Sequence, residues 1–178
     1  MARNKGRSRA AATPAIAAVQ ASGVEHTVHS YQATGSDFGD EAARVMGERL
    51  GVDAARVFKT LILETARPPA GSRLALAVAV LPVTSPLDLK AAAAALECSK
   101  AALAPVELAE KTTGYVVGGV SPLGQKRPLA TVVDISALDH PTILCSAGRR
   151  GWEIELAGAD LIALTNAVTA TLTAESTR

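Results

Sequence analysis

The 178-residue sequence has few aromatic residues and no long apolar run. Phe, Tyr and Trp make up 3% of it, which argues against a dedicated surface for stacking single-stranded nucleic acid. The longest apolar run, residues 74–81, is too short to cross a membrane. The basic N-terminus is not followed by an apolar segment, so we expect no signal peptide. These absences favour a cytoplasmic protein that does not associate with a membrane.

The residues of common catalytic and metal sites are also scarce. Cys98 and Cys145 are far apart and form no C-x-x-C pattern, so we expect no disulfide framework and a reducing compartment. His26 and His29 would point to opposite faces of a strand, and there is no H-E-x-x-H, so we expect no metal and no cofactor. The sequence contains no G-x-S-x-G motif, so this signature of a serine nucleophile is absent. Cys145 closes an apolar strand, which is more typical of a core residue than of a nucleophile.

Charge is nearly balanced overall, at +1, which excludes a protein that binds nucleic acid by net charge alone. The positive residues are unevenly distributed. Four of them fill the first ten positions, and Lys126, Arg127, Arg149 and Arg150 lie in two expected loops. We expect residues 1–12 to form a disordered basic arm and residues 13–178 to form a single domain.

The distribution of apolar residues predicts a mixed α+β fold. Helices are expected at residues 14–22, 40–51, 85–96, 105–112 and 158–165, where apolar spacing and capping residues agree. Strands are expected at residues 24–31, 57–63, 74–81, 114–119, 129–134, 142–146, 152–156 and 167–173. Because strands and helices do not strictly alternate, we predict a mixed, barrel-like sheet of about seven to eight strands surrounded by about five helices.

Lys59 stands out because it interrupts the apolar strand VFKTLIL. An ammonium group is costly to bury, and neither face of this strand is clearly polar. Lys59 is therefore interpreted either as a lysine that protects an edge strand from aggregation or as a lysine that reaches into a ligand cavity.

Two glycine-rich loops are candidates for anion binding. Residues 118–127 do not form a P-loop, because Gln125 occupies the position of the P-loop lysine. The pair Gly118-Gly119 permits either a tight turn or a loop whose N–H groups bind an anion or an oxyanion. Residues 146–153 form either a solvated basic turn or a phosphate contact followed by the carboxylate of Glu153.

Three blocks of sequence together resemble one family. They are FGDEAARVMGERLGVDAARVFKTLIL, TGYVVGGVSPLGQKRPLATVVD and SAGRRGWEIELAGADLI, in that order. They resemble the YbaK/EbsC family of trans-editing aminoacyl-tRNA deacylases, which is related to the editing insertion domain of bacterial prolyl-tRNA synthetase. The resemblance covers roughly residues 13–175. It implies a cavity that receives the aminoacylated 3′ end of a tRNA.

The resemblance assigns roles to matching positions. It implies that Lys59 is the catalytic residue and that the substrate-binding residues are Tyr31, Phe38, Thr60, Gly118, Gly119, Val120, Ser121, Pro122, Ser146, Ala147, Gly148 and Glu153. Many members have Asp where this chain has Glu153. With this family in view, Lys126, Arg127, Arg149 and Arg150 become candidates for contacts with tRNA phosphates.

The implied activity is editing of mischarged aminoacyl-tRNA, with Cys-tRNA(Pro) as the expected substrate. The substrate's own thiol would be the nucleophile, and prolyl-tRNA synthetase would be a partner. Two alternatives remain open. One is attack by water on Ala-tRNA or on another small aminoacyl-tRNA, and the other is a non-catalytic module that binds a tRNA 3′ end or a nucleotide.

Overall fold

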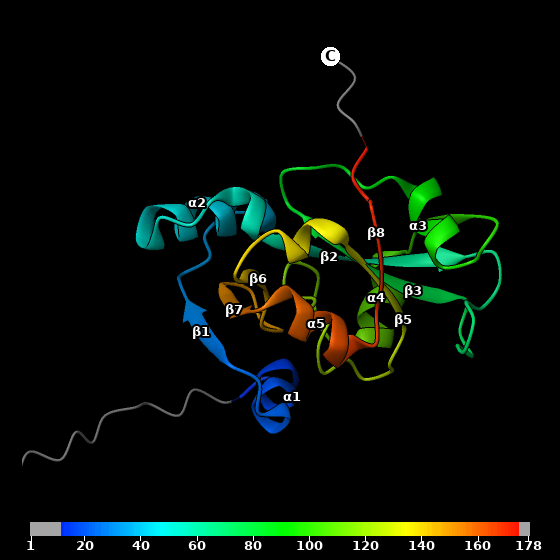
Figure 1. Ribbon diagram of the computed structural model, residues 1–178. Coiled ribbons are helices and arrows are strands. Elements are labelled where there is room, and N and C mark those ends of the chain that lie inside the picture. Colours follow the sequence, from blue (N-terminus) through cyan, green and yellow to red (C-terminus); the bar gives the residue numbers. More distant parts are fainter. Residues whose placement is uncertain (1–11, 175–178) are drawn as a thin grey trace, which may run out of the picture.

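The computed structural model describes residues 12–174, which contain five α-helices and eight β-strands (Figure 1). The helices are α1 (Pro14–Ser22), α2 (Phe38–Leu50), α3 (Leu89–Ala95), α4 (Val106–Thr113) and α5 (Gly158–Thr165). The strands are β1 (His26–Ser30), β2 (Phe58–Thr65), β3 (Leu76–Pro82), β4 (Ala101–Leu103), β5 (Ala130–Asp134), β6 (Ile143–Ser146), β7 (Trp152–Leu156) and β8 (Val168–Ala170). Short 3₁₀ helices η1 (Ala54–Arg56) and η2 (Ile135–Leu138) precede β2 and β6.

The strands form two sheets. One has the order β1-β7-β6 and is antiparallel throughout. The other has the order β4-β2-β3-β5-β8, in which β3–β5 and β5–β8 are parallel pairs and the other pairs are antiparallel. The predicted α+β class with a mixed sheet is confirmed. The predicted barrel-like closure is not confirmed, because the strands form two separate sheets that are joined, within residues 12–174, by the single bridge Val57–Leu144.

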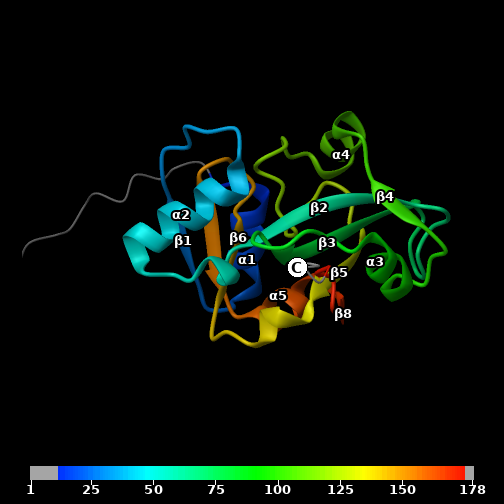
Figure 2. The same ribbon diagram turned by 90° about the horizontal axis from the view of Figure 1, so that it is seen from above.

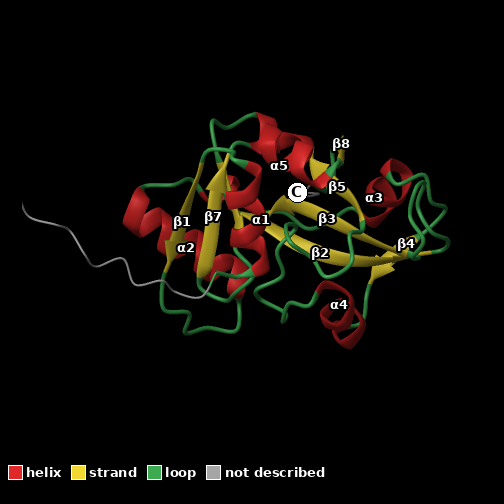
Figure 3. Ribbon diagram, turned by 90° about the horizontal axis from the view of Figure 1, so that it is seen from below, coloured by secondary structure: helices red, strands yellow, loops and turns green. Residues whose placement is uncertain are grey.

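Three apolar clusters hold the helices against these sheets. Alternate residues of β2 and β3 face opposite sides, so Ile62 and Val78 pack in the cluster that includes α4, while Leu63 and Ala77 pack in the cluster that includes α3. Figures 2 and 3 show α4 and α3 on either side of the five-stranded sheet. A third cluster lies between α2 and the strands that carry Val57 and Leu144.

Side-chain caps mark the starts of α1, α3 and the short 3₁₀ helix η1. The Thr13 hydroxyl accepts a hydrogen bond from the Ile16 N–H at 3.1 Å, and the Asp53 carboxylate accepts one from the Ala55 N–H at 2.9 Å. The helix expected from Ser85 begins later, with Asp88 as its N-cap. The reason is that a bridge between Leu87 and Thr173 holds the preceding residues extended.

Residues 114–119 do not form the predicted strand. Their donors are used locally: Tyr115 N–H donates to Thr113 Oγ1, Val117 N–H donates to a Glu110 carboxylate oxygen, and Gly119 N–H donates to Val116 O. The segment is therefore a connection that wraps back from α4. The structure also contains β4, which was not predicted and which pairs with the last residues of β2.

Two other expectations concern the ends of the chain and the membrane. The basic arm, residues 1–12, falls almost entirely outside the described residues. Across residues 12–174, every helix is too short or too polar to pass through a bilayer.

Candidate active site

Lys59 lies on the side of β2 that faces α2. It shares that side with Val57, which is buried beneath α2. The Lys59 ammonium donates to the Val83 carbonyl oxygen at 3.5 Å. Burial lowers the pKa of Lys59, and the nearby carboxylates of Asp40 and Asp37 counteract this effect. A partly desolvated cation therefore lies beside the N-terminal turn of α2.

The small sheet places three more predicted residues on the side facing α2, one at β6, one at β7 and one just after β1. Ser146 and Glu153 are directly paired, so their side chains share one face of the small sheet. Glu153 also pairs with His29, and Tyr31 lies two residues beyond His29 on that same face. Val57 and Leu144 form a parallel bridge. Lys59 follows Val57 by two residues and Ser146 follows Leu144 by two residues, so both continue in the same direction along adjacent segments. Lys59, Ser146, Glu153 and Tyr31 thus gather on one side of the strands.

Glu153 is almost completely buried, with 7% of its surface exposed. This burial raises the pKa of its carboxyl group from 4.5 to about 8. Among residues 12–174, no group donates a hydrogen bond to this carboxyl. Burial, followed by the charges of Glu153 and Glu41, raises the pKa of the Tyr31 hydroxyl, which stays neutral at physiological pH. The site therefore presents an acid and a phenol close together.

Gly118 brings the second block against the first. Its φ is +88°, a left-handed conformation, and a Cβ there would lie 2.4 Å from Cδ2 of Phe38. Only glycine permits this approach to the first residue of α2. The Arg150 guanidinium also contacts Phe38, and its central carbon lies 4.3 Å from the ring centroid. Its Nε donates to Val117 O at 2.9 Å. The three predicted blocks therefore meet at Phe38.

The turn before β7 is anchored from several directions. A Cβ at Gly151, whose φ is +75°, would lie 2.3 Å from the Tyr31 carbonyl oxygen. The Tyr31 N–H donates to Gly151 O at 2.8 Å. The Thr13 hydroxyl donates to Ala147 O and connects α1 to the same turn. A Cβ at Gly148 would meet the ring of Tyr115.

The Gly118–Pro122 segment keeps some of its backbone donors available. Gly119 N–H is used by Val116 O, at 2.9 Å. The N–H groups of Gly118, Val120 and Ser121 donate to no acceptor among residues 12–174. Val120, Ser121 and Pro122 are themselves buried, so this segment contributes backbone rather than exposed side chains.

Three predicted residues lie apart from this group. Thr60 points to the opposite side of β2 from Lys59, and its buried hydroxyl has no hydrogen-bond partner among the described residues. Lys126 lies beyond α4, where its N–H donates to Thr113 O. Arg127 lines a separate cavity. Arg149 stays at the turn, with its guanidinium carbon 5.3 Å from the Trp152 ring centroid.

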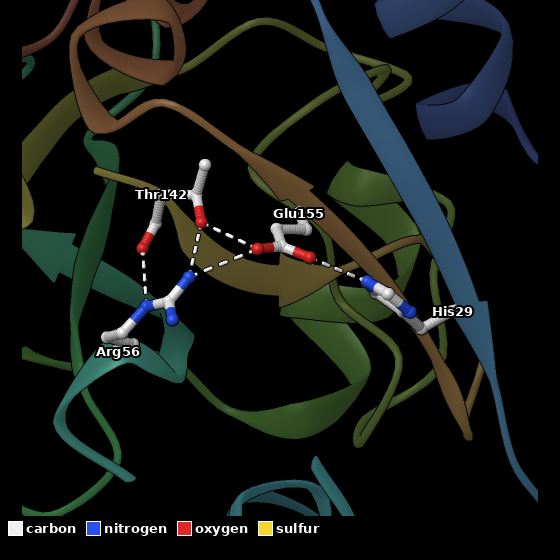
Figure 4. Close-up of polar contacts among 4 residues, drawn as sticks. All are labelled: His29, Arg56, Thr142 and Glu155. Carbon is white, nitrogen blue, oxygen red and sulfur yellow. Dashed lines mark hydrogen bonds and ion pairs between the residues drawn. The ribbon is translucent and has the colours of Figure 1, made fainter. Parts of the chain in front are cut away.

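The structure adds a polar network that the sequence reasoning missed (Figure 4). The Glu155 carboxylate binds His29 Nε2 at 2.8 Å and Arg56 Nη2 at 3.1 Å, and it accepts a hydrogen bond from the Thr142 hydroxyl at 2.6 Å. Arg56 also donates from Nε to Thr142 O at 2.8 Å. Arg56 immediately precedes Val57, so the network connects the start of the Lys59 strand to the strand of Glu153.

The missed carboxylates, Asp37 and Asp40, carried no motif that separates them from ordinary N-terminal helix residues. Within residues 12–174 no group of three or more His, Cys, Asp or Glu side chains is arranged to hold a metal. Cys145 has no exposed surface, and burial together with the charge of Glu153 raises the pKa of its thiol far above neutrality. Its side chain packs in the apolar cluster on the other side of the small sheet.

Comparisons with known proteins identify similar chains. Residues 41–164 match the aminoacyl-tRNA editing domain family. A protein of Enterococcus faecalis, provisionally named Cys-tRNA(Pro)/Cys-tRNA(Cys) deacylase EbsC, is 37% identical over 132 residues, which cover 74% of this chain and 77% of the relative. A crystal structure described as a provisional trans-editing enzyme for prolyl-tRNA synthetase has a TM-score of 0.77 and 22% identity, over 94% of this chain and 99% of that one. At this identity the structural likeness supports the fold alone.

Proposed function

This chain belongs to the aminoacyl-tRNA editing domain family, and on that premise we propose that it cleaves the ester of mischarged Cys-tRNA(Pro) in trans. The family match and the curated relative confirm the sequence-based identification as an aminoacyl-tRNA deacylase. The observation that carries the proposal is the partly desolvated ammonium of Lys59 on the same side of the strands as Ser146 and Glu153.

Lys59 is proposed to bind the terminal ribose and phosphate. A cation that has lost part of its water shell interacts more strongly with an incoming phosphate than a solvated one does. Its counter-charges are Asp37, the N-cap residue of α2, and Asp40 in the first turn, and neither forms a direct ion pair with it. The ammonium is therefore free to exchange its contact with Val83 for one with the substrate.

Glu153 is proposed to receive the α-amino group of the charged amino acid. An α-amino group has a pKa of about 7.7–8.0, close to the value of about 8 that burial gives to Glu153. At neutral pH both groups therefore carry a proton when free, so pairing of the Glu153 carboxylate with the substrate ammonium should release close to one proton. The ammonium would supply the partner that this buried carboxyl group lacks in the free protein.

The proposed reaction uses the thiol of the substrate. Its sulfur attacks the ester carbonyl carbon, the S–C bond forms, and the C–O bond to the ribose breaks. The thiol proton ends on the ribose oxygen, which gives a cyclic thioester and uncharged tRNA. The N–H groups of Gly118, Val120 and Ser121 are proposed to stabilise the negative charge that develops on the carbonyl oxygen. No protein nucleophile is needed, in agreement with the burial of Cys145.

We also propose that prolyl-tRNA synthetase assists delivery of the tRNA, and that the protein acts in the cytoplasm, where the substrate is made. The name of the curated relative supports the substrate, since it specifies Cys-tRNA(Pro) and Cys-tRNA(Cys). Arg149 and Arg150, exposed at the turn beside Phe38, are proposed to contact phosphates near the 3′ end.

The test is single-turnover deacylation of a panel of mischarged tRNAs. Lys59→Ala should lower the rate on Cys-tRNA(Pro) by about 10²-fold or more, as expected when a contact that positions the reacting ester is removed. Lys90→Ala, at an exposed position of α3, is the matched control and should retain full activity. Cys145→Ala should change the rate little. An active Lys59→Ala enzyme with an unchanged melting temperature would overturn the mechanism.

S-alkylation of the charged cysteine separates the two nucleophiles. It should block attack by the substrate thiol and leave attack by water unaffected. Full hydrolysis of the alkylated substrate would assign the reaction to water. Binding of every tRNA in the panel without turnover of any would indicate a non-catalytic module.

A further inference from the structure

A cavity of about 770 Å³ lies away from Lys59. Its walls are the loop between β2 and β3, the end of α3, the residues that lead into β5, and the segment between α5 and β8. Leu74, Leu96 and Leu129 give it an apolar floor. Of the residues assigned to the tRNA from the sequence, Arg127 is the one found in its wall. This volume is typical of a site that holds a ligand.

Two exposed arginines, Arg73 and Arg127, supply positive charge to this cavity. Neither guanidinium makes a hydrogen bond or an ion pair with another group in residues 12–174. The one carboxylate in the wall is Glu97. Guanidinium groups with free donors are well suited to phosphate oxygens, which they bind through two parallel hydrogen bonds.

The other polar groups of the wall do not suit a small free anion. The hydroxyls of Ser72, Thr131 and Thr165 donate to the carbonyl oxygens of Leu74, Leu129 and Leu161, at 3.0, 3.0 and 2.8 Å. A compact phosphate site would use such hydroxyls, together with backbone N–H groups, to enclose its ligand. In this cavity the donors without an acceptor belong to two exposed guanidinium groups. Two separate exposed cations suit the spaced phosphates of an extended polyanion better than a single small anion.

The spacing from Lys59 fits the polynucleotide already proposed as substrate. In the β2–β3 register Lys59 pairs with Leu81 and Glu64 pairs with Leu76, five residues further along. At about 3.3 Å per residue this is about 17 Å. A strand of duplex DNA advances about 3.4 Å per nucleotide, so the distance corresponds to about five nucleotides of such a strand and to fewer nucleotides of an extended strand. The unpaired 3′ end of a tRNA is a few nucleotides long, and the phosphates that follow belong to the acceptor stem.

Basic residues also connect the two sites along the surface. Arg150, beside Phe38, donates to Val117 O at 2.9 Å. Gly114 lies three residues before Val117. A Cβ built at Gly114 would lie 3.4 Å from the Cβ of Lys126. The short segment between Gly114 and Val117 thus lies between Arg150 and Lys126, and Lys126 is followed by Arg127 at the cavity.

We propose that the cavity with Arg73 and Arg127 binds the sugar–phosphate backbone of the acceptor stem of the same tRNA whose charged 3′ end lies at Lys59. This inference rests on the proposed function for the identity of the RNA. It assigns to the far end of the β2–β3 hairpin a role in affinity for the whole tRNA. The chemistry of the ester remains with the residues around Lys59.

The test compares two substrates and one binding measurement. The variant Arg73→Glu/Arg127→Glu should raise KM for full-length Cys-tRNA(Pro) about tenfold and leave deacylation of a cysteinylated CCA trinucleotide unchanged. The dependence of tRNA affinity on salt should become shallower by about two units of log K per log [salt], because two phosphate contacts are lost. Glu97→Gln should act in the opposite direction and lower KM for the full-length tRNA.

The control is Arg44→Glu/Lys90→Glu, which makes the same change in net charge at exposed positions outside the cavity. Equal KM changes in the two double variants would overturn the site, as would equal changes on tRNA and trinucleotide. Fluorescence anisotropy with uncharged tRNA needs no catalysis. Loss of that binding in the cavity variant supports the site even if no charged tRNA is hydrolysed, whereas unchanged binding overturns it even if deacylation is confirmed. Inorganic phosphate is added at a concentration equal to that of the phosphate groups of the tRNA. If it displaces the tRNA, the cavity is a site for a free anion, and the RNA site is overturned.

Discussion

The burial of Glu153 leads to a specific prediction about stability against pH. Its carboxyl has a pKa of about 8 in the folded protein, raised from 4.5 by burial. Between these two values the folded state keeps a proton that the unfolded state releases, so stability falls as pH rises. The contribution is fully present below pH 4.5 and is lost as pH rises through about 8.

The magnitude follows from the size of the shift. Each pKa unit corresponds to about 1.4 kcal/mol, so the rise from 4.5 to about 8 gives an upper limit of ~5 kcal/mol lost from the free energy of unfolding. Glu153→Gln keeps the shape of the protonated carboxyl and has no proton to lose. The variant should therefore be similar to the wild type near pH 5 and more stable by several kcal/mol near pH 9.

Urea unfolding measured across this pH range provides the assay. The difference in unfolding free energy between Glu153→Gln and the wild type should grow steadily with pH. Glu25→Gln, at an exposed position, is the matched control and should show no such trend. The two pKa values, 4.5 and about 8, set the range in which the difference must grow. If the Glu153→Gln and wild-type curves run parallel through that range, the buried carboxyl is not protonated and the reasoning is refuted.

Two further predictions concern other contacts of the site. Gly118→Ala should lower the unfolding free energy by about 2 kcal/mol or more, because a Cβ would lie 2.4 Å from Phe38 in a left-handed backbone; a variant as stable as the wild type in thermal unfolding would contradict this contact. Burial acts to raise the pKa of Glu155, but hydrogen bonds from Thr142 and His29 outweigh it and lower the pKa below 4.5. Glu155→Gln should therefore be less stable than the wild type at neutral pH. In acid titrations this deficit should shrink as pH falls through the folded-state value, and a deficit independent of pH would count against the network.

Local sequence signals predicted most of the secondary structure correctly. Thr13 and Asp53 cap their elements as expected, because short-range hydrogen bonds decide helix starts. The strand around Lys59 was predicted from its apolar residues, and β2 indeed spans Phe58–Thr65. Residues 114–119 were mispredicted because apolar composition does not reveal that the Glu110 side chain binds the Val117 N–H.

The site itself depended on the resemblance to a known family. From its strand alone, Lys59 could not be distinguished from an edge lysine, and the structure shows why both interpretations had merit. The β4 strand pairs only with Leu63–Thr65, so among the described strands the Lys59 half of β2 has a ladder partner, β3, on one side alone. The interpretation as a ligand-binding lysine draws its support from the start of α2, because Asp40 and the N-cap residue Asp37 come near Lys59 only through tertiary packing.

The pairing of β1 with β7 has a consequence for synthesis of the protein. β1 ends at Ser30, and its one ladder partner among the described strands begins at Trp152. At a translation rate of about 5–20 residues per second, β1 leaves the ribosome roughly 6 to 25 seconds before that partner does. Tyr31 reaches Glu153 only after this pairing, so a ribosome-bound chain lacks an assembled site until nearly all of the domain has emerged. The nascent protein is thus prevented from acting on the charged tRNAs that surround it while it is being made.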